Sequence, residues 1–405
     1  MDRKLITRRK AIKGIGAASI TGTLLSSVGT TSAQSDEYVP RQTARQIAKN
    51  AVKQISKDSE FDDWQPEEVR APQLYYGKVQ SENSIEYVPR AWVFAIENRG
   101  DDVGYITIDA DQLVTPVLAF GRSKAPHKRV DRASQVAKAN GVSIHDRFLY
   151  QGGVQFGIET TDRRMIDLRG DGILPLPAVS NADNLKPTHD PTEQGNKQTK
   201  EDQFTLQGDD LNAPDWEGGT DDSISNVPNW KSYDDGGAST TSYGSGDDTW
   251  DEWDGCSPIA GSMAIGYHEG IDEWDDADER EALIDRLHDD MGTDSDGISD
   301  FNDIDNGISN YAEGTYSYNG NNNHWLIKGN IEDAVANNNP PMLNMTNGPY
   351  SKDSEWINGH SVTVVGYRNG SGYFYHKVHN GYNTAPDRVS NGNWTDAFVT
   401  RITKQ

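Results

Sequence analysis

A polar stretch in the middle of the chain most constrains how these 405 residues can fold. Residues 181–215 contain three prolines, and their few apolar residues follow neither a helical nor a strand period. Such composition is typical of a linker. We therefore expect two domains, a first at 36–180 and a second at 216–405, which the length of the chain allows.

The N-terminal 33 residues have the pattern of an export signal. Arg8 and Arg9 precede a mildly apolar stretch that runs to Val28, and small residues follow at 31–33. Paired arginines before a weakly hydrophobic segment are typical of a twin-arginine signal, and the stretch is too short and polar for a membrane anchor. Residues 1–33 thus predict a cleaved signal peptide and a secreted, extracellular protein without a membrane segment.

The chain is strongly acidic. It has 63 acidic and 38 basic residues, for a formal net charge of -25, and residues 201–300 hold 29 Asp and Glu but only three Lys and Arg. Such a surface repels phosphate, which argues against nucleic acid as a partner. Acidic self-repulsion is screened in concentrated salt, so together with the export signal the charge suggests a halophilic source such as a haloarchaeon.

Apolar periodicity predicts an α+β fold for both regions. The elements expected in the first are helices at 43–55 and 132–140 and strands at 91–96, 105–108 and 114–120. The elements expected in the second are helices at 256–269, 276–291 and 326–335 and strands at 341–345, 361–367 and 372–378. The first region shows no catalytic group of side chains.

Cys256 is the only cysteine of the chain. It follows Gly255 and precedes Pro258, which predicts a helix that starts at the cysteine. The positive end of a helix dipole favours thiolate, the reactive form. A small buried residue is the alternative interpretation. Because an unpaired cysteine in an exported protein calls for an explanation, we regard Cys256 as a candidate nucleophile.

An Asn-Gly dipeptide at 369–370 indicates a hairpin between the last two predicted strands. A two-residue loop would set His360 opposite His379, and a three-residue loop would set it opposite Asn380. Facing residues have Cβ atoms about 5 Å apart. Either register brings a histidine within reach of an asparagine, which is the arrangement that a cysteine peptidase needs to activate its thiol.

Three motifs resemble those of the papain-like cysteine peptidases: Gly-Cys-Ser-Pro at 255–258, Gly-His-Ser-Val at 359–362 and Val-His-Asn-Gly-Tyr at 378–382. The order Cys, His, Asn matches that superfamily. Streptopain-like enzymes and peptidases similar to bacteriocin-leader (double-glycine) processing domains are the most similar groups. Residues 92–121 resemble the inhibitory prodomain of streptopain-like zymogens, so the resemblance touches both regions through short motifs.

The resemblance implies a papain-like domain at 216–405, a helical half plus an antiparallel sheet, behind a small α+β prodomain at 36–180. Cys256 would be the nucleophile, His360 the general base and then acid, and Asn380 the residue that orients His360, with His379 as the alternative. It implies no cofactor. The partners would be protein or peptide substrates and the chain's own prodomain, acting as an intramolecular inhibitor.

One part of the family pattern is missing. Papain-like enzymes usually place a Gln before the cysteine as the second oxyanion donor, beside the cysteine's own N–H, and none lies between Gln207 and Cys256. Asn229 and Ser232 are the candidates to replace it. The gap keeps two functions open: an exported cysteine endopeptidase made as a zymogen, or a weak or inactive module that binds peptides or cell-surface components.

Two other chemistries follow less directly from the sequence. Acyl transfer to an amine would use the same fold and the same thiol. The acidic segment 294–303 resembles part of an EF-hand loop, but a Gly stands at the first ligand position and Asp303 at the last, where Glu is usual. We interpret it as an acidic turn between helices and expect no metal site.

Overall fold

The computed structural model describes residues 38–81, 84–110, 116–169, 173–175, 219–230, 254–271, 277–294, 297, 299–313, 316–346, 359–370, 373–381, 385–394 and 396–405. The predicted signal peptide 1–33, the predicted linker 181–215 and Ser232 lie outside these ranges. Residues 37–405 form one compact unit. We call its described residues up to 175 the N-terminal region and those from 219 onward the C-terminal region.

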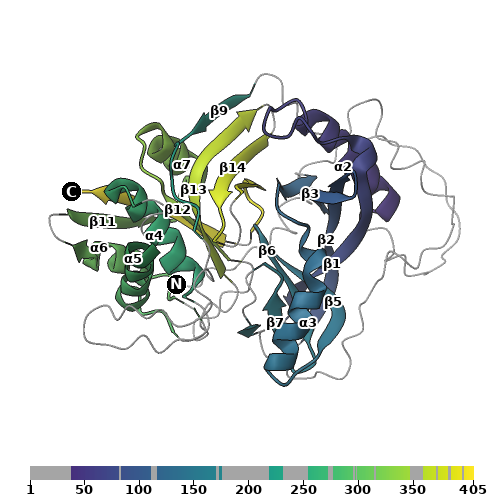
Figure 1. Ribbon diagram of the computed structural model, residues 1–405, viewed down its shortest axis with the longest axis horizontal. Helices are drawn as coiled ribbons and strands as arrows, with labels where there is room; N and C mark the ends of the chain where they lie inside the picture. The colour runs from purple at the N-terminus through teal and green to yellow at the C-terminus, as the bar shows by residue number, and fades with distance from the viewer. Residues whose placement is uncertain are drawn as a thin grey trace, which may run out of the picture. The chain divides into compact units, whose positions relative to one another are not determined.

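The N-terminal region is mostly strand (Figure 1). Its elements are α2 (Arg41–Ile55), β1 (Val69–Ser81), β2 (Ser84–Asn98), β3 (Asp101–Asp109), β4 (Val117–Gly121), α3 (Val130–Ala139), β5 (Ile144–Gly152), β6 (Gln155–Thr160), β7 (Arg164–Asp167) and β8 (Ile173–Pro175), with 3-10 turns at Pro66–Glu68 and Pro126–Arg129. The two predicted helices are confirmed, as are the strands predicted at 91–96 and 105–108, inside β2 and β3. Of the strand predicted at 114–120, residues 117–120 lie in β4, and 114 and 115 lie outside the described residues. Strands β1 and β5 to β8 were not expected from the sequence.

The C-terminal region places helices before most of its strands, as predicted. Its elements are β9 (Thr220–Ser223), α4 (Cys256–Glu269), α5 (Ala277–Asp290), α6 (Ile304–Asn310), β10 (Ala312–Glu313), β11 (Tyr316–Asn323), α7 (Ile327–Ala336), β12 (Met342–Thr346), β13 (Gly359–Gly370), β14 (Tyr373–His379), β15 (Asp387–Ser390) and β16 (Asp396–Lys404). The chain is thus an α+β protein. Within the described residues, no helix combines the length and apolarity needed to cross a membrane.

The described strands join into one mixed, largely antiparallel sheet with the order β10-β11-β16-β12-β13-β14-β15-β4-β3-β2-β1-β5-β6-β7-β8, and β9 pairs with β13. Strands β1 and β5 are paired in parallel. The two regions meet where β15 pairs with β4, through Asp387–Gly121, Arg388–Phe120 and Val389–Ala119. Strand β15 therefore has a neighbour from each region.

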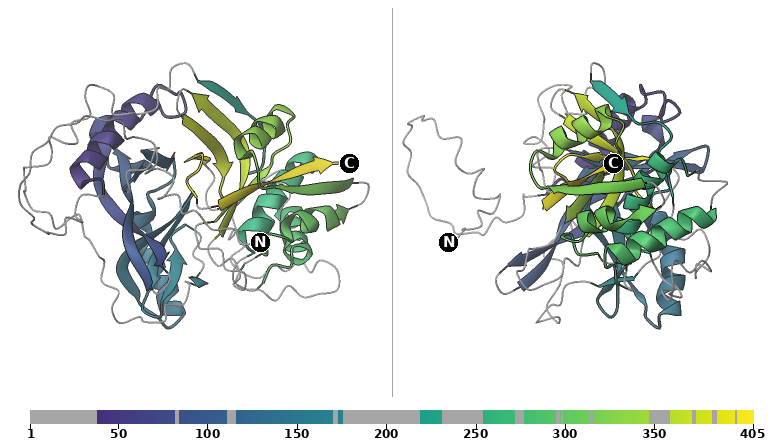
Figure 2. Two further views of the ribbon diagram at one scale, coloured as in Figure 1. Left: turned by 180° about the vertical axis from the view of Figure 1, so that it is seen from behind. Right: turned by 90° about the vertical axis from the view of Figure 1, so that its left-hand side faces the viewer.

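The alternation of side chains along β12 separates two apolar clusters. Leu343 packs in one cluster with Ile331 of α7, whereas Met342 packs in another with Ile259 of α4. Because neighbouring side chains of a strand point to opposite faces, α4 and α7 cover opposite faces of the sheet. Figure 2 shows the strands between these two helices, with α5 and α6 beside α4.

Candidate active site

Cys256 is the first residue of α4, as predicted from the sequence. Gly255 before it has φ +94, a conformation that glycine adopts without strain, and a Cβ added there would lie 2.8 Å from the carbonyl oxygen of Gly297. Pro258 fits the first turn because its missing N–H would have no helical partner there. The sequence around the cysteine therefore specifies both the start of the helix and the close packing of its N-terminus.

Hydrogen bonds fix the first turn of α4 to β13. The hydroxyls of Ser257 and Ser361 are 2.8 Å apart, and the Thr363 hydroxyl donates to the carbonyl oxygen of Ala260 at 2.7 Å. Ser361 also donates to Asn344 Oδ1 of β12 at 2.6 Å. These buried polar contacts hold the helix start in one position relative to the strand that carries His360.

The thiol lies against the backbone beside His360. The N–H of Ser361 donates to Cys256 Sγ, with 3.4 Å between nitrogen and sulfur, and Ser361 directly follows His360 in β13. Cys256 as a whole is partly exposed, but its sulfur is buried. This burial raises the pKa of the thiol, and the hydrogen bond from the Ser361 N–H lowers it. The surroundings of the sulfur in this structure therefore disfavour the thiolate.

His360 is buried at the start of β13. Burial, and then the positive charge of Arg169, lower the pKa of its imidazole to about 3, against a hydrogen bond to the backbone of Asn380. That bond favours the charged ring, so the ring donates to the Asn380 carbonyl oxygen. His360 is accordingly neutral at neutral pH.

The hairpin that carries these residues has another register than the one expected. Gly370 pairs with Tyr373 and Thr363 with His379, so the prediction that His360 faces His379 or Asn380 is wrong. The strand runs through Asn369 and Gly370, because this end of β13 also pairs with β9. Asn380 still reaches His360, through its backbone, because it lies just beyond the end of β14.

The side chains of His379 and Asn380 have different partners. The His379 ring donates from Nδ1 to the carbonyl oxygen of Pro228 at 2.8 Å. The Asn380 amide donates to the carboxylate of Asp387, which also accepts from Arg169 of the N-terminal region. Asp387, Arg169 and Ser361 surround the candidate triad, and the sequence analysis singled out none of them.

Asn229, the first candidate for the second oxyanion donor, is 6 % exposed. Its neighbours are anchored: the Pro228 carbonyl accepts from His379, and the N–H of Trp230 donates to Met263 Sδ at 3.3 Å. Among the described residues, neither atom of the Asn229 amide has a hydrogen-bond partner. A buried amide left in this state costs about 1–3 kcal/mol, so a function for it is expected.

No group of three or more His, Cys, Asp or Glu side chains placed to hold a metal ion occurs among the described residues, which leave out 295, 296 and 298 of the acidic segment. A scan against protein-family models finds no match for the chain, and a search of curated proteins finds no relative.

Proposed function

We propose that this protein is an exported cysteine endopeptidase of the papain-like kind, made as a zymogen with a streptopain-like prodomain at 36–180. One observation carries the proposal. The only thiol of the chain accepts a hydrogen bond from Ser361, the residue after His360. A thiol bonded to the backbone next to a histidine, whose ring is held by Asn380, supports the arrangement of nucleophile and base that cysteine peptidases use.

The residues would act in a fixed order. His360 takes the thiol proton of Cys256, and the sulfur attacks the carbonyl carbon of a peptide bond. The C–N bond then breaks, the imidazolium gives its proton to the leaving amine, and a thioester remains. Water, which gives a proton to His360, attacks the thioester and releases the acid and the thiol. The carbonyl oxygen of Asn380 would orient the ring throughout.

The unpartnered amide of Asn229 suits the charge that develops in this reaction. A tetrahedral intermediate carries an oxyanion, which the backbone N–H of Cys256 and one further N–H would stabilise. Replacing Asn229 with Ala is expected to lower kcat roughly 100- to 1000-fold with little change in KM. Steady-state kinetics on a peptide would measure this, and the exposed Ser225→Ala is the control. A loss confined to KM would remove Asn229 from this role.

The raised pKa of the thiol and the neutral imidazole fit a precursor that is inactive until its N-terminal region is removed. The same two observations favour a second function, a module of this fold that binds peptides without cleaving them. In the first case the protonation states change when the N-terminal region leaves. In the second they do not change.

The two functions differ in how an irreversible thiol-directed peptidase inhibitor labels the protein. The experiment compares full-length chain in high salt, before and after limited proteolysis between the regions, with adducts mapped by mass spectrometry. We expect labelling of Cys256 to be fast after proteolysis and to fall about 100-fold or more in His360→Ala, but not in the control His324→Ala, an exposed histidine of the C-terminal region. Slow labelling at a rate that is the same in His360→Ala would support the second function, a module that binds peptides without cleaving them.

A further inference from the structure

The carboxylate of Asp387 is shared between the candidate site and the N-terminal region. Its Oδ2 accepts from the Asn380 amide and from Arg169 Nη1, the latter at 2.6 Å. Its Oδ1 accepts from the hydroxyl of Tyr105 at 2.9 Å. Arg169 and Tyr105 belong to the N-terminal region and Asn380 to the C-terminal region. One buried carboxylate therefore joins the residue that holds His360 to two residues outside its own region.

The Arg169–Asp387 ion pair is fully enclosed but incompletely bonded. The two side chains are 2 % and 0 % exposed. The guanidinium lies over the rings of Tyr105, at 4.7 Å, and Phe156, at 5.0 Å, and its Nε and Nη2 have no hydrogen-bond partner in the part of the chain that the structure describes. A buried pair with unmet donors gives little net stability, because desolvation offsets the attraction. Stability alone does not explain why the pair is present.

The pair has an effect on the site that follows from its charges. The positive charge of Arg169 acts on His360 and disfavours an imidazolium. The negative charge of Asp387 is bonded to Asn380, which holds the same ring, and would favour an imidazolium if it were not neutralised. Arg169 thus repels a proton from His360 and pairs with the carboxylate that the Asn380 side chain bonds.

We propose that Asp387 is a positioning residue of the candidate site, acting on His360 through Asn380, and that Arg169 neutralises it while the N-terminal region is in place. Removal of that region withdraws Arg169 and Tyr105 and leaves the carboxylate to Asn380 alone. The proton of Cys256 can then pass to His360, which gives the thiolate–imidazolium pair. This inference rests on the proposed function, because it assigns Asp387 a part in activating Cys256.

Replacing Arg169 with Met in the full-length chain tests the proposal. Met keeps apolar contact with Tyr105 and Phe156 but removes the charge, whereas the matched variant Arg169→Lys keeps the charge. The readout is the rate at which iodoacetamide alkylates Cys256 between pH 5 and 9. We expect Arg169→Met to react about 10-fold faster or more near pH 7, with a new titration step below the thiol's own, and Arg169→Lys to behave as the wild type.

Three further variants decide what a faster rate means. Glu60→Gln breaks ion pairs across the same interface without touching Asp387, and it should leave the rate unchanged. Asp387→Asn added to Arg169→Met should abolish the gain. His360→Ala added to Arg169→Met should abolish it too. A gain that survives Asp387→Asn, or that Glu60→Gln reproduces, would show that the interface has merely opened.

The outcomes separate this inference from the proposed function. Equal rates in wild type and Arg169→Met, with alkylation after proteolysis still dependent on His360, would overturn the inference alone. Alkylation that never depends on His360 would overturn the proposed function with it. Near-ultraviolet circular dichroism checks folding, and Arg169→Gln, neutral but still a hydrogen-bond donor, replaces the Met variant if that one does not fold.

Discussion

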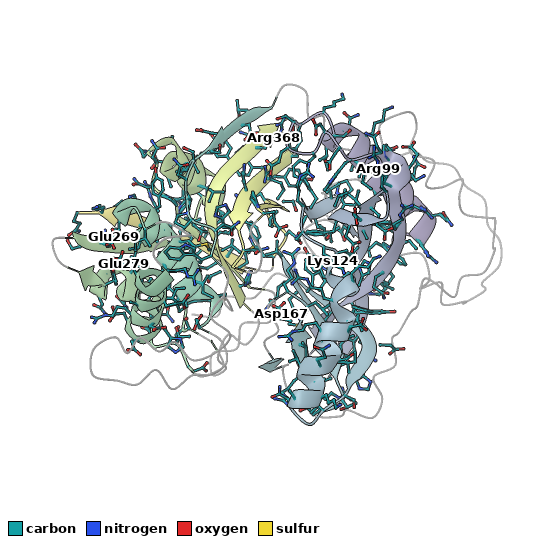
Figure 3. The ribbon with its side chains drawn as sticks, in the orientation of Figure 1. Arg99, Lys124, Asp167, Glu269, Glu279 and Arg368 are labelled. Carbon is teal, nitrogen blue, oxygen red and sulfur yellow. The ribbon has the colours of Figure 1, made fainter. Side chains whose placement is uncertain are left out.

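Two sets of ion pairs join the regions with opposite polarity. Glu60 of the N-terminal region pairs with Lys377 and Arg388 of the C-terminal region. In the other set, Arg169 of the N-terminal region pairs with Asp387 of the C-terminal region. Glu60 lies 3.4 Å from Lys377 and 2.5 Å from Arg388, and its side chain is 29 % exposed. The Asp387 carboxylate is inaccessible to solvent. A third contact, Asp58 with Arg368, is only partly exposed, at 15 % for each side chain; Figure 3 labels Arg368 near the end of β13.

The difference lies in what water and salt can reach. Exposed pairs are solvated when they open and screened when salt is added, so they contribute little and can separate easily. A buried pair is not screened, and its loss leaves a charge in an apolar environment. Of these ion pairs, the one at Asp387 also bonds the Asn380 side chain. The ion pairs of Glu60 therefore only hold the two regions together. The ion pair of Asp387, in contrast, also contacts a residue of the candidate site.

The largest expected effect comes from breaking the buried pair on one side only. Asp387→Leu strands the Arg169 charge and should lower the free energy of unfolding by about 3–5 kcal/mol. The double variant Arg169→Met, Asp387→Leu should recover most of this loss. Denaturant titration at fixed salt measures both. If the single and double variants are equally unstable, the unpaired charge of Arg169 is not the cause of the destabilisation.

A smaller effect is expected from crowding the same carboxylate. A Cβ at Gly121 of β4 would fall on Asp387 Oδ1 and 3.3 Å from the Tyr105 ring. Gly121→Ala should therefore destabilise the chain by about 1–3 kcal/mol. The control is Gly329→Ala in α7, where nothing lies within 4 Å and Ala should stabilise the helix slightly. Equal shifts in the melting temperature of Gly121→Ala and Gly329→Ala would contradict the close approach of Gly121 to Asp387 and Tyr105.

Lower pH should also reduce the free energy of unfolding, through the buried His379. Burial, then the charges of Lys377 and Arg388, lower the pKa of His379 to about 4, against the Pro228 bond and Asp387. Since the unfolded state then binds the proton more tightly, this histidine's contribution is full above about pH 6.5 and falls by roughly 1.4 kcal/mol per pH unit from there toward pH 4.

The variant His379→Gln isolates this term. The slope of unfolding free energy against pH between 6 and 4.5 should become shallower by roughly 1.4 kcal/mol per pH unit at most. Urea titrations at several pH values measure the slope. An unchanged slope would mean that His379 takes up no proton on unfolding in this range.

The smallest effect is expected at the Glu60 end, where the carboxylate is partly exposed although Arg388 is buried. Glu60→Gln should cost at most about 1 kcal/mol, and the cost should shrink further in molar salt. Denaturant titrations at low and high salt would show it. A loss as large as that of Asp387→Leu, or one that salt does not reduce, would erase the distinction between the two ends.

The sequence predicted the parts of the site that depend on neighbours along the chain. Gly255 and Pro258 define the start of α4, and the helix indeed begins at Cys256. The α+β character and strands β12, β13 and β14 followed from local periodicity in the same way, whereas β9, β10, β11, β15 and β16 were not expected. The involvement of Asn229, His360 and Asn380 in catalysis remains a prediction.

Contacts that depend on strand order could not be predicted. The predicted register of β13 and β14 was wrong for two reasons. Pairing with β9 extends β13 past the Asn-Gly dipeptide, and a bulge follows Val364. Arg169 and Asp387 are single charges 218 positions apart. They meet only because β4 pairs with β15, and nothing near either residue indicates that pairing.

The shortness of β15 has a consequence for the mature form that the proposed function implies. A strand that loses a neighbour exposes unpaired N–H and C=O groups, which can recruit other chains. Strand β15 has four residues, and three of them pair with β4. Two of those three are the charged Asp387 and Arg388. Release of the N-terminal region would therefore uncover an edge too short and too charged to serve as a template for aggregation.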